Sequence, residues 1–139
     1  MIAKMQAHMT LIGDHFDIND VTEELRTKPS WIKRRDEKLN ASGHLFGHDE
    51  WGVNTGWYDL DDETNTFESV LQNLLNLLPP DAPLLKSLAQ KHHAEWHILF
   101  DIDVYEGFPS MIIDNTFIAF VGEMGGRIGF DINNYQESI

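Results

Sequence analysis

The chain has 139 residues, no cysteine and a formal net charge of −13. This length suits a single domain over residues 1–139, and the missing cysteines exclude a disulfide scaffold, a thiolate zinc site and a cysteine nucleophile, which favours the cytoplasm. The negative charge would repel a phosphate backbone and an anionic membrane, so we expect no nucleic-acid or membrane partner and favour a cationic protein instead.

The N-terminal region is predicted to form a strand and a short helix. Residues 1–8 lack the apolar core of a signal peptide, and no run approaches the ~20 apolar residues of a membrane span. Asp17 is expected to cap a helix that ends at the Lys-Pro-Ser sequence of residues 28–30. Period-two alternation over residues 5–12 predicts a strand whose one face carries Met5, Ala7, Met9 and Leu11.

Residues 26–38 hold six of the ten basic residues of the chain. Their proline, serine and charge content predicts an exposed loop. Within it, Arg34 and Arg35 could hold a phosphate or carboxylate, with Trp31 as a stacking platform. The alternative is a basic loop that folds back on an acidic body. Residues 45–46 and 51–58 are then predicted to form a hairpin.

Two helices are predicted in the middle of the chain. Residues 59–63 form an acidic linker, and Asn65 is expected to cap the first helix in a capping box with Glu68. The leucine-rich pattern up to residue 78 follows helical spacing, and two prolines stop it. Asp81 is expected to cap the second helix.

Residues 95–105 give the strongest strand pattern. Trp96, Ile98 and Phe100 are predicted to face the core, together with Leu74 from the preceding helix. Asp114 is expected to cap a further helix that ends at two glycines, and residues 127–133 form the last predicted strand, with its apolar residues inward.

The predicted order is strand, helix, two strands, two helices, strand, helix and strand. Strands that alternate this cleanly are half exposed, which favours a mainly antiparallel sheet with helices on one face. A ferredoxin-like core extended by one helix and one strand is the simplest topology with this order. The sequence therefore predicts an α+β fold.

Several of these segments resemble a bacterial family known as domain of unknown function 4279. The resemblance is carried by residues 16–31, by the leucine-rich helix and proline break of residues 71–80, and by the glycine turn and final strand of residues 125–132. Residues 32–37 depart from it, because the family commonly has a glycine-bearing basic turn there. The resemblance implies an α+β fold and a bacterial or phage origin, and it implies no particular activity.

Candidate chemistry is sparse. Asp101 and Asp103 project from one strand face about 6.8 Å apart, where they could bind a divalent cation or supply an acid and a base. The same pattern is typical of a solvated sheet face. In a strand, His93 and His97 lie about 13.6 Å apart, too far for one metal ion. The chain has no P-loop, dinucleotide fingerprint or nucleophile elbow, so we expect no metal, no other cofactor and no enzymatic activity.

Two classes of function fit the sequence, for either a monomer or a homodimer. The first is a non-enzymatic acidic protein that captures a cationic protein, with a toxin-neutralising immunity protein as its sharpest form. The second is a small-ligand-binding protein or a metal-dependent enzyme that uses the exposed sheet face or the basic loop. The residues predicted to bind are Asp59, Asp61, Asp62, Glu63, Asp101, Asp103, Trp31, Arg34 and Arg35.

Overall fold

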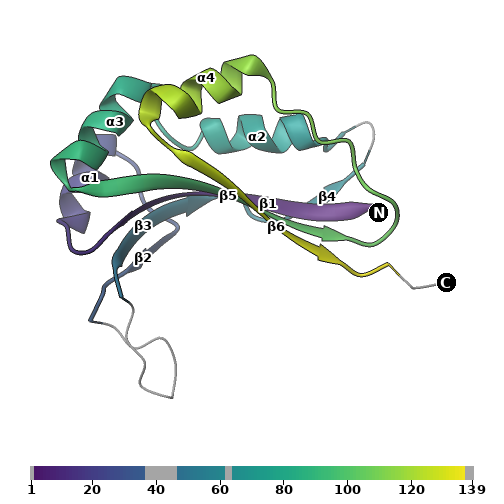
Figure 1. Cartoon of the computed structure of the whole chain (residues 1–139), viewed down its shortest axis with the longest axis horizontal. Helices are drawn as coiled ribbons and strands as arrows, with labels where there is room; N and C mark the ends of the chain where they lie inside the picture. Colours follow the sequence, from purple (N-terminus) through teal and green to yellow (C-terminus); the bar gives the residue numbers. More distant parts are fainter. Residues whose placement is uncertain (1, 37–46, 62–63, 137–139) are drawn as a thin grey trace.

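A computed structural model describes residues 2–36, 47–61 and 64–136. Three of the helices in these ranges, α2, α3 and α4, lie along one face of a curved sheet (Figure 1). The elements are β1 (Ala3–Gly13), α1 (Ile18–Leu25), β2 (Trp31–Lys33), β3 (Asp49–Asn54), β4 (Tyr58–Leu60), α2 (Phe67–Leu75), α3 (Ala82–Lys91), β5 (Ala94–Val104), α4 (Asn115–Met124) and β6 (Arg127–Asn134).

The sheet is mixed but mainly antiparallel. Its strand order is β2-β3-β1-β5-β6, and β4 pairs with β1 beyond the end of β3. β1 and β5 are antiparallel, whereas β5 and β6 are parallel and joined through α4. The α+β fold with helices on one sheet face is confirmed.

The strand order differs from the ferredoxin-like core that we expected. A ferredoxin-like core is built from split βαβ units, in which another strand lies between the two parallel strands. Here β5 and β6 pair directly. The alternation of a strand identifies its covered face but not its neighbours, so the sequence pattern did not determine this order.

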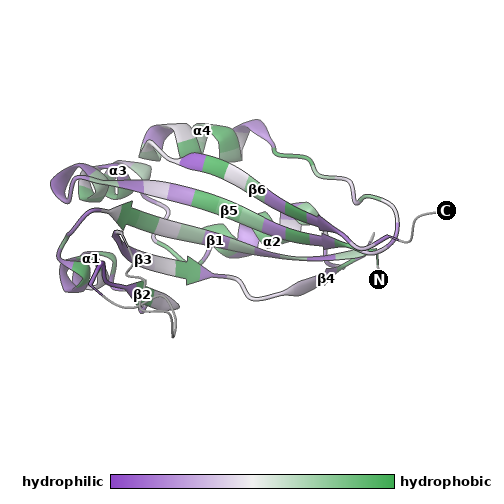
Figure 2. Ribbon diagram, turned by 60° about the horizontal axis from the view of Figure 1, so that its bottom comes forward, coloured by the Kyte–Doolittle hydropathy of each residue, from purple (hydrophilic) through white to green (hydrophobic). Residues whose placement is uncertain are grey.

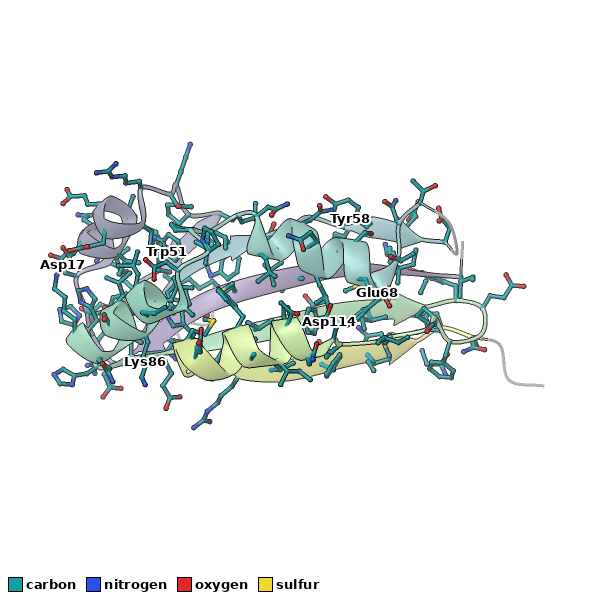
Figure 3. The ribbon with its side chains drawn as sticks, turned by 90° about the horizontal axis from the view of Figure 1, so that it is seen from above. Asp17, Trp51, Tyr58, Glu68, Lys86 and Asp114 are labelled. Carbon is teal, nitrogen blue, oxygen red and sulfur yellow. The ribbon has the colours of Figure 1, made fainter. Side chains whose placement is uncertain are left out.

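The odd-numbered residues of β1 from Ala3 to Leu11 face the helices and are buried. Trp51 and Trp96 meet edge to face beside them, with ring centroids 6.1 Å apart. The indole of Trp51 donates a hydrogen bond to the Thr22 hydroxyl of α1, and that of Trp96 donates to the carbonyl of Leu85 in α3. Figure 3 shows Trp51 at the α1 end of the molecule. The predicted core residues Trp96, Ile98, Phe100 and Leu74 are all buried, as expected.

Aspartates cap three of the helices as predicted. The side chains of Asp17, Asp81 and Asp114 accept backbone N–H groups of the first turns of α1, α3 and α4. The predicted cap of α2 was wrong by one residue: Thr66, not Asn65, is the N-cap, and Ser69 returns the second bond of the capping box. Three of the 23 acidic residues thus have a structural role at helix ends.

Two predictions on the N-terminal half were wrong. Trp31–Lys33 is a strand, β2, that pairs with β3 rather than part of an exposed loop. The connection predicted at residues 47–50 is partly strand, because β3 already begins at Asp49. The first strand of the predicted hairpin, residues 45–46, lies outside the described residues.

An ion-pair cluster joins α1 to the end of α3. Lys91 Nζ and His92 Nε2 each lie 2.8 Å from the same oxygen of Asp20. The hydrogen bond from Lys91 lowers the pKa of Asp20 below its ordinary value of 3.8, against an opposing effect of burial, and His92 assists. The hydrogen bond to Asp20 likewise raises the pKa of Lys91.

We expect this cluster to give an acid-side dependence of stability. A carboxyl whose pKa falls on folding stabilises the fold above its unfolded value of 3.8, and this contribution is lost as the pH falls through the folded value. Urea unfolding should therefore separate wild type from Asp20→Asn at pH 7, and the difference should shrink at pH 3. Glu23→Gln, an exposed change on the same helix, is the control. An Asp20→Asn difference that is independent of pH would contradict the expectation.

Candidate functional site

The sheet face opposite the helices carries a groove of ≈ 720 Å³. Figure 2 turns this face forward, where apolar and polar residues alternate along β1 and β5. The groove is built from the residues of β1 that point away from the core and from their neighbours on both sides. β1 supplies His8, Thr10 and Ile12, β2 and β3 supply Trp31, Lys33 and Glu50, and β5 and β6 supply His97, Leu99, Arg127 and Gly129.

Trp31 forms one wall of the groove. Its backbone pairs with Gly52, and its indole lies over that glycine so closely that a Cβ there would clash with the ring. The ring also meets the imidazole of His8 edge-on, with centroids 5.4 Å apart. A glycine on the neighbouring strand thus lets an aromatic ring lie flat against the sheet and define the groove.

A row of polar side chains continues from the groove along β1 and β5. His8 Nε2 lies 2.6 Å from Asp101 Oδ2, and the amide of Gln6 donates to the same oxygen. Nδ1 of His8 is buried and has no hydrogen-bond partner in the described part of the chain. In the neutral ring, donation from Nε2 to Asp101 leaves Nδ1 as an acceptor. The row therefore contains one buried ring nitrogen without a hydrogen-bond partner among the described residues, next to the ring of Trp31.

The rim of the groove carries charges of both signs. Arg127 lies 3.5 Å from Glu95, which is also 3.4 Å from His97. Glu50 lies 3.4 Å from His48 on the opposite side, and Lys33 stands beside it on β2. Ile12 and Leu99 supply an apolar floor and Trp31 an apolar wall, so the groove combines apolar surface with a polar rim, as binding sites commonly do.

The predicted acidic residues do not form one free patch. Asp101 is hydrogen-bonded to His8 and Gln6, and Asp103 is buried and accepts a hydrogen bond from Asn133. Asp61 accepts the backbone N–H groups of residues 64 and 65 and so shapes a turn. Of the predicted acids, Asp59 is exposed on β4. Asp62 and Glu63 lie outside the described residues.

The basic stretch divides at β2. Trp31 lines the groove, whereas Arg34 and Arg35 follow the strand and are not among the groove residues. The backbone N–H of Arg35 donates a hydrogen bond to Asp49, so the backbone of Arg35 helps to hold the segment after β2 against β3. Within the described ranges, no group of three or more histidine or acidic side chains is arranged to hold a metal ion.

The comparison with known proteins gives a family without an assigned activity. Residues 3–135 match the model of a domain of unknown function, DUF4279. The chain belongs to this family. No curated protein and no solved structure matches the chain. The match covers all the strands and helices of the described DUF4279 domain, and none of these helices is long and apolar enough to cross a bilayer.

Sequence reasoning missed the floor of the groove in this DUF4279 domain. The alternation of residues 5–12 and 95–105 implies only that His8, Thr10, Ile12 and Leu99 lie on the outward faces of two strands. One feature of the sequence could have indicated the site. Leu99 and Ile12 are large apolar residues on strand faces that were predicted to be exposed to solvent. Their convergence depends on the pairing of His8 with Leu99 and of Thr10 with His97, which is a tertiary feature.

Proposed function

We propose that this DUF4279 domain is a non-enzymatic binding protein, and that its open-face groove receives an apolar or aromatic side chain of a cationic protein partner. The observation that carries the proposal is the groove itself, a partly apolar concavity on the sheet face opposite α2, α3 and α4. Binding anchors are commonly large side chains that insert into such pockets, surrounded by a polar rim.

The charge of the chain supports a cationic partner. A formal net charge of −13 on a small body attracts a basic protein over a long range and raises the rate of encounter. At the rim, Glu50 lines the groove and Glu95 lies 3.5 Å from the lining residue Arg127, so carboxylates stand beside the basic side chains there.

The sharpest form of the proposal is a bacterial, cytoplasmic immunity protein that blocks a cationic toxin domain. A small acidic domain that binds tightly without chemistry would suit this role.

The pairing of His8 with Asp101 resembles half of a catalytic triad, but Nδ1 of His8 contacts no hydroxyl among the described residues. A nucleophile at that position would be needed for acyl-transfer chemistry.

The groove is tested by Leu99→Arg, which should weaken peptide binding at least about tenfold because a charged side chain would fill the apolar floor. Libraries of random peptides displayed on phage are panned on wild type alone, and the enriched peptides are then measured on wild type and on the variant. Enriched peptides should carry an aromatic or large aliphatic residue next to lysine or arginine. Their synthetic forms are then titrated by tryptophan fluorescence.

The matched control is Leu77→Arg, because Leu77 at the end of α2 is 36% exposed and Leu99 is 38% exposed. Leu77→Arg should leave peptide affinity unchanged. Absence of enrichment, or peptides that bind Leu99→Arg as well as wild type, would contradict the proposal. Selection of acidic peptides would contradict its charge argument and favour a ligand held by Lys33 and Arg127, including a small anionic molecule.

A further inference from the structure

The sheet edge formed by β6 is apolar and exposed. β6 is the last strand in the sheet, and it pairs only with β5 among the described strands. Phe130 and Ile132 face the helix side opposite the buried Phe100 and Ile102, yet they are 46% and 45% exposed. An edge strand with exposed apolar side chains is a template for another strand.

Helix α4 leaves a second apolar surface beside this edge. It is the outermost helix on the β6 side of the molecule (Figure 3). Its polar residues Asn115, Thr116 and Glu123 are exposed, but so is the apolar Ile118, which is 56% exposed. Phe120, two residues on, projects from the opposite side of the helix and packs against the core. Ile118 therefore lies on the side of α4 away from the core.

Gly122 lies on the same side of α4 as Ile118, four residues along. A glycine inside a helix is destabilising relative to alanine. A Cβ at this position would meet nothing within 4 Å, so the packing of a single chain does not require a glycine there. A glycine on an exposed helix face does allow another helix to approach closely.

We propose that β6 pairs with β6 of a second copy of this chain, antiparallel about a two-fold axis at Gly129. This register places Arg127 opposite Asp131 of the second copy, twice over, on the open face. It places Ile128 opposite Phe130 of the second copy on the helix face. Opposite charges and apolar pairs directly across two strands stabilise the pairing, and a two-fold interface uses each pair twice.

The charges select this register over its neighbours. If the axis moves one residue to Phe130, Arg127 faces Asn133 and Asp131 faces Gly129. If it moves to Ile128, Arg127 faces Gly129 and Asp131 faces Gly125, which lies before the strand. Only the axis at Gly129 pairs both charged residues of β6 with an opposite charge. Among the described residues of one chain, Arg127 lies 3.5 Å from Glu95, and both side chains of this ion pair are exposed.

The length of α4 agrees with the same axis. At 1.5 Å per residue its ten residues span about 15 Å. α4 ends just before β6 begins, and β6 runs back beneath the helix in the opposite direction (Figure 1). The midpoint of α4 therefore lies about 7.5 Å from the start of β6. At 3.3 Å per residue this distance is roughly two residues beyond Arg127. A two-fold axis at Gly129 would therefore set the midpoints of the two α4 helices side by side and cover Ile118 and Gly122.

Sedimentation equilibrium of the full chain at low salt tests the pairing. Wild type should be a dimer, and Asp131→Arg should raise the dissociation constant at least about tenfold, because two arginines would then face each other. Arg127→Asp alone should do the same by opposing two aspartates. The double variant, Arg127→Asp with Asp131→Arg, exchanges the charges and should restore the constant to within about threefold of wild type. Glu106→Arg, an exposed change outside β6, is the control.

Each outcome decides the proposal. A wild-type chain that is monomeric at all concentrations overturns it, and so does a dimer that is indifferent to Asp131→Arg or is not restored by the exchange. Circular dichroism shows whether each variant is folded. If a β6 variant unfolds, Ile118→Asp on α4 provides the second measurement, and a dimer that survives it overturns the proposal. Because the peptide titration is separate, failure of the dimer leaves the groove proposal standing.

Discussion

Truncation of Phe100 to alanine is expected to lower the free energy of unfolding by ~3–5 kcal/mol. Phe100 is fully buried at the centre of β5. Its ring lies 5.4 Å from that of Phe67 in α2, 6.3 Å from that of Phe117 in α4 and 5.2 Å from that of Phe130 in β6. The truncation would leave a cavity between two helices and the sheet, where neighbouring aromatic rings cannot easily close it.

Urea unfolding followed by circular dichroism measures this loss. Leu99→Ala is the matched control, because it removes a large aliphatic side chain one residue away on the open face and should cost under about 1 kcal/mol. A loss below about 1 kcal/mol for Phe100→Ala would mean that the inward face of β5 does not carry the core.

Replacement of Asp49 by alanine is expected to cost about 3 kcal/mol. The carboxylate of Asp49 is buried at the start of β3 and accepts the backbone N–H of Phe16 at 3.0 Å and that of Arg35 at 2.7 Å. His15 Nδ1 lies 3.1 Å from the same carboxylate. One side chain thus holds the segment before α1 and the segment after β2 against β3, and its removal leaves two backbone donors without their acceptor.

Asp49→Asn separates lost hydrogen bonds from lost volume. The amide oxygen accepts one backbone N–H, but the amide nitrogen faces the other, so about half of the loss should remain. Thermal and urea unfolding of both variants provide the measurement. Asp59→Asn, an exposed aspartate on β4, should change stability by less than about 0.5 kcal/mol. Equal stability of Asp49→Ala and wild type would show that the two loops are held by other contacts.

Asp49 and Trp31 show where sequence reasoning failed. Asp49 was assigned to a hairpin connection because Gly-His-Asp-Glu has the composition of a turn. Trp31–Lys33 was assigned to an exposed loop because three residues give too little alternation to predict a strand among so many charges. In both places a partner distant in the sequence decides the structure. β2 is a strand because it pairs with β3, and Asp49 is buried because its carboxylate accepts the backbone N–H groups of residues 16 and 35.

The last strand shows a different limit. Its alternation correctly gave the helix side of the sheet for Phe130 and Ile132, but both side chains are exposed rather than buried. The pattern of a strand specifies a face, whereas burial depends on whether a helix covers that face. At the sheet edge, the covering helix α4 is not wide enough to bury β6.

The sequence by itself determined the α+β class, the buried faces of β1 and β5 and the aspartate caps of three helices, because these depend on local periodicity and on side chains within a few residues. Tertiary structure alone decided the strand order, the burial of Asp49 and Asp103, and the groove. The groove requires the strand order β2-β3-β1-β5-β6, and strand pairing over such separations depends on the packing of the whole sheet rather than on any local pattern.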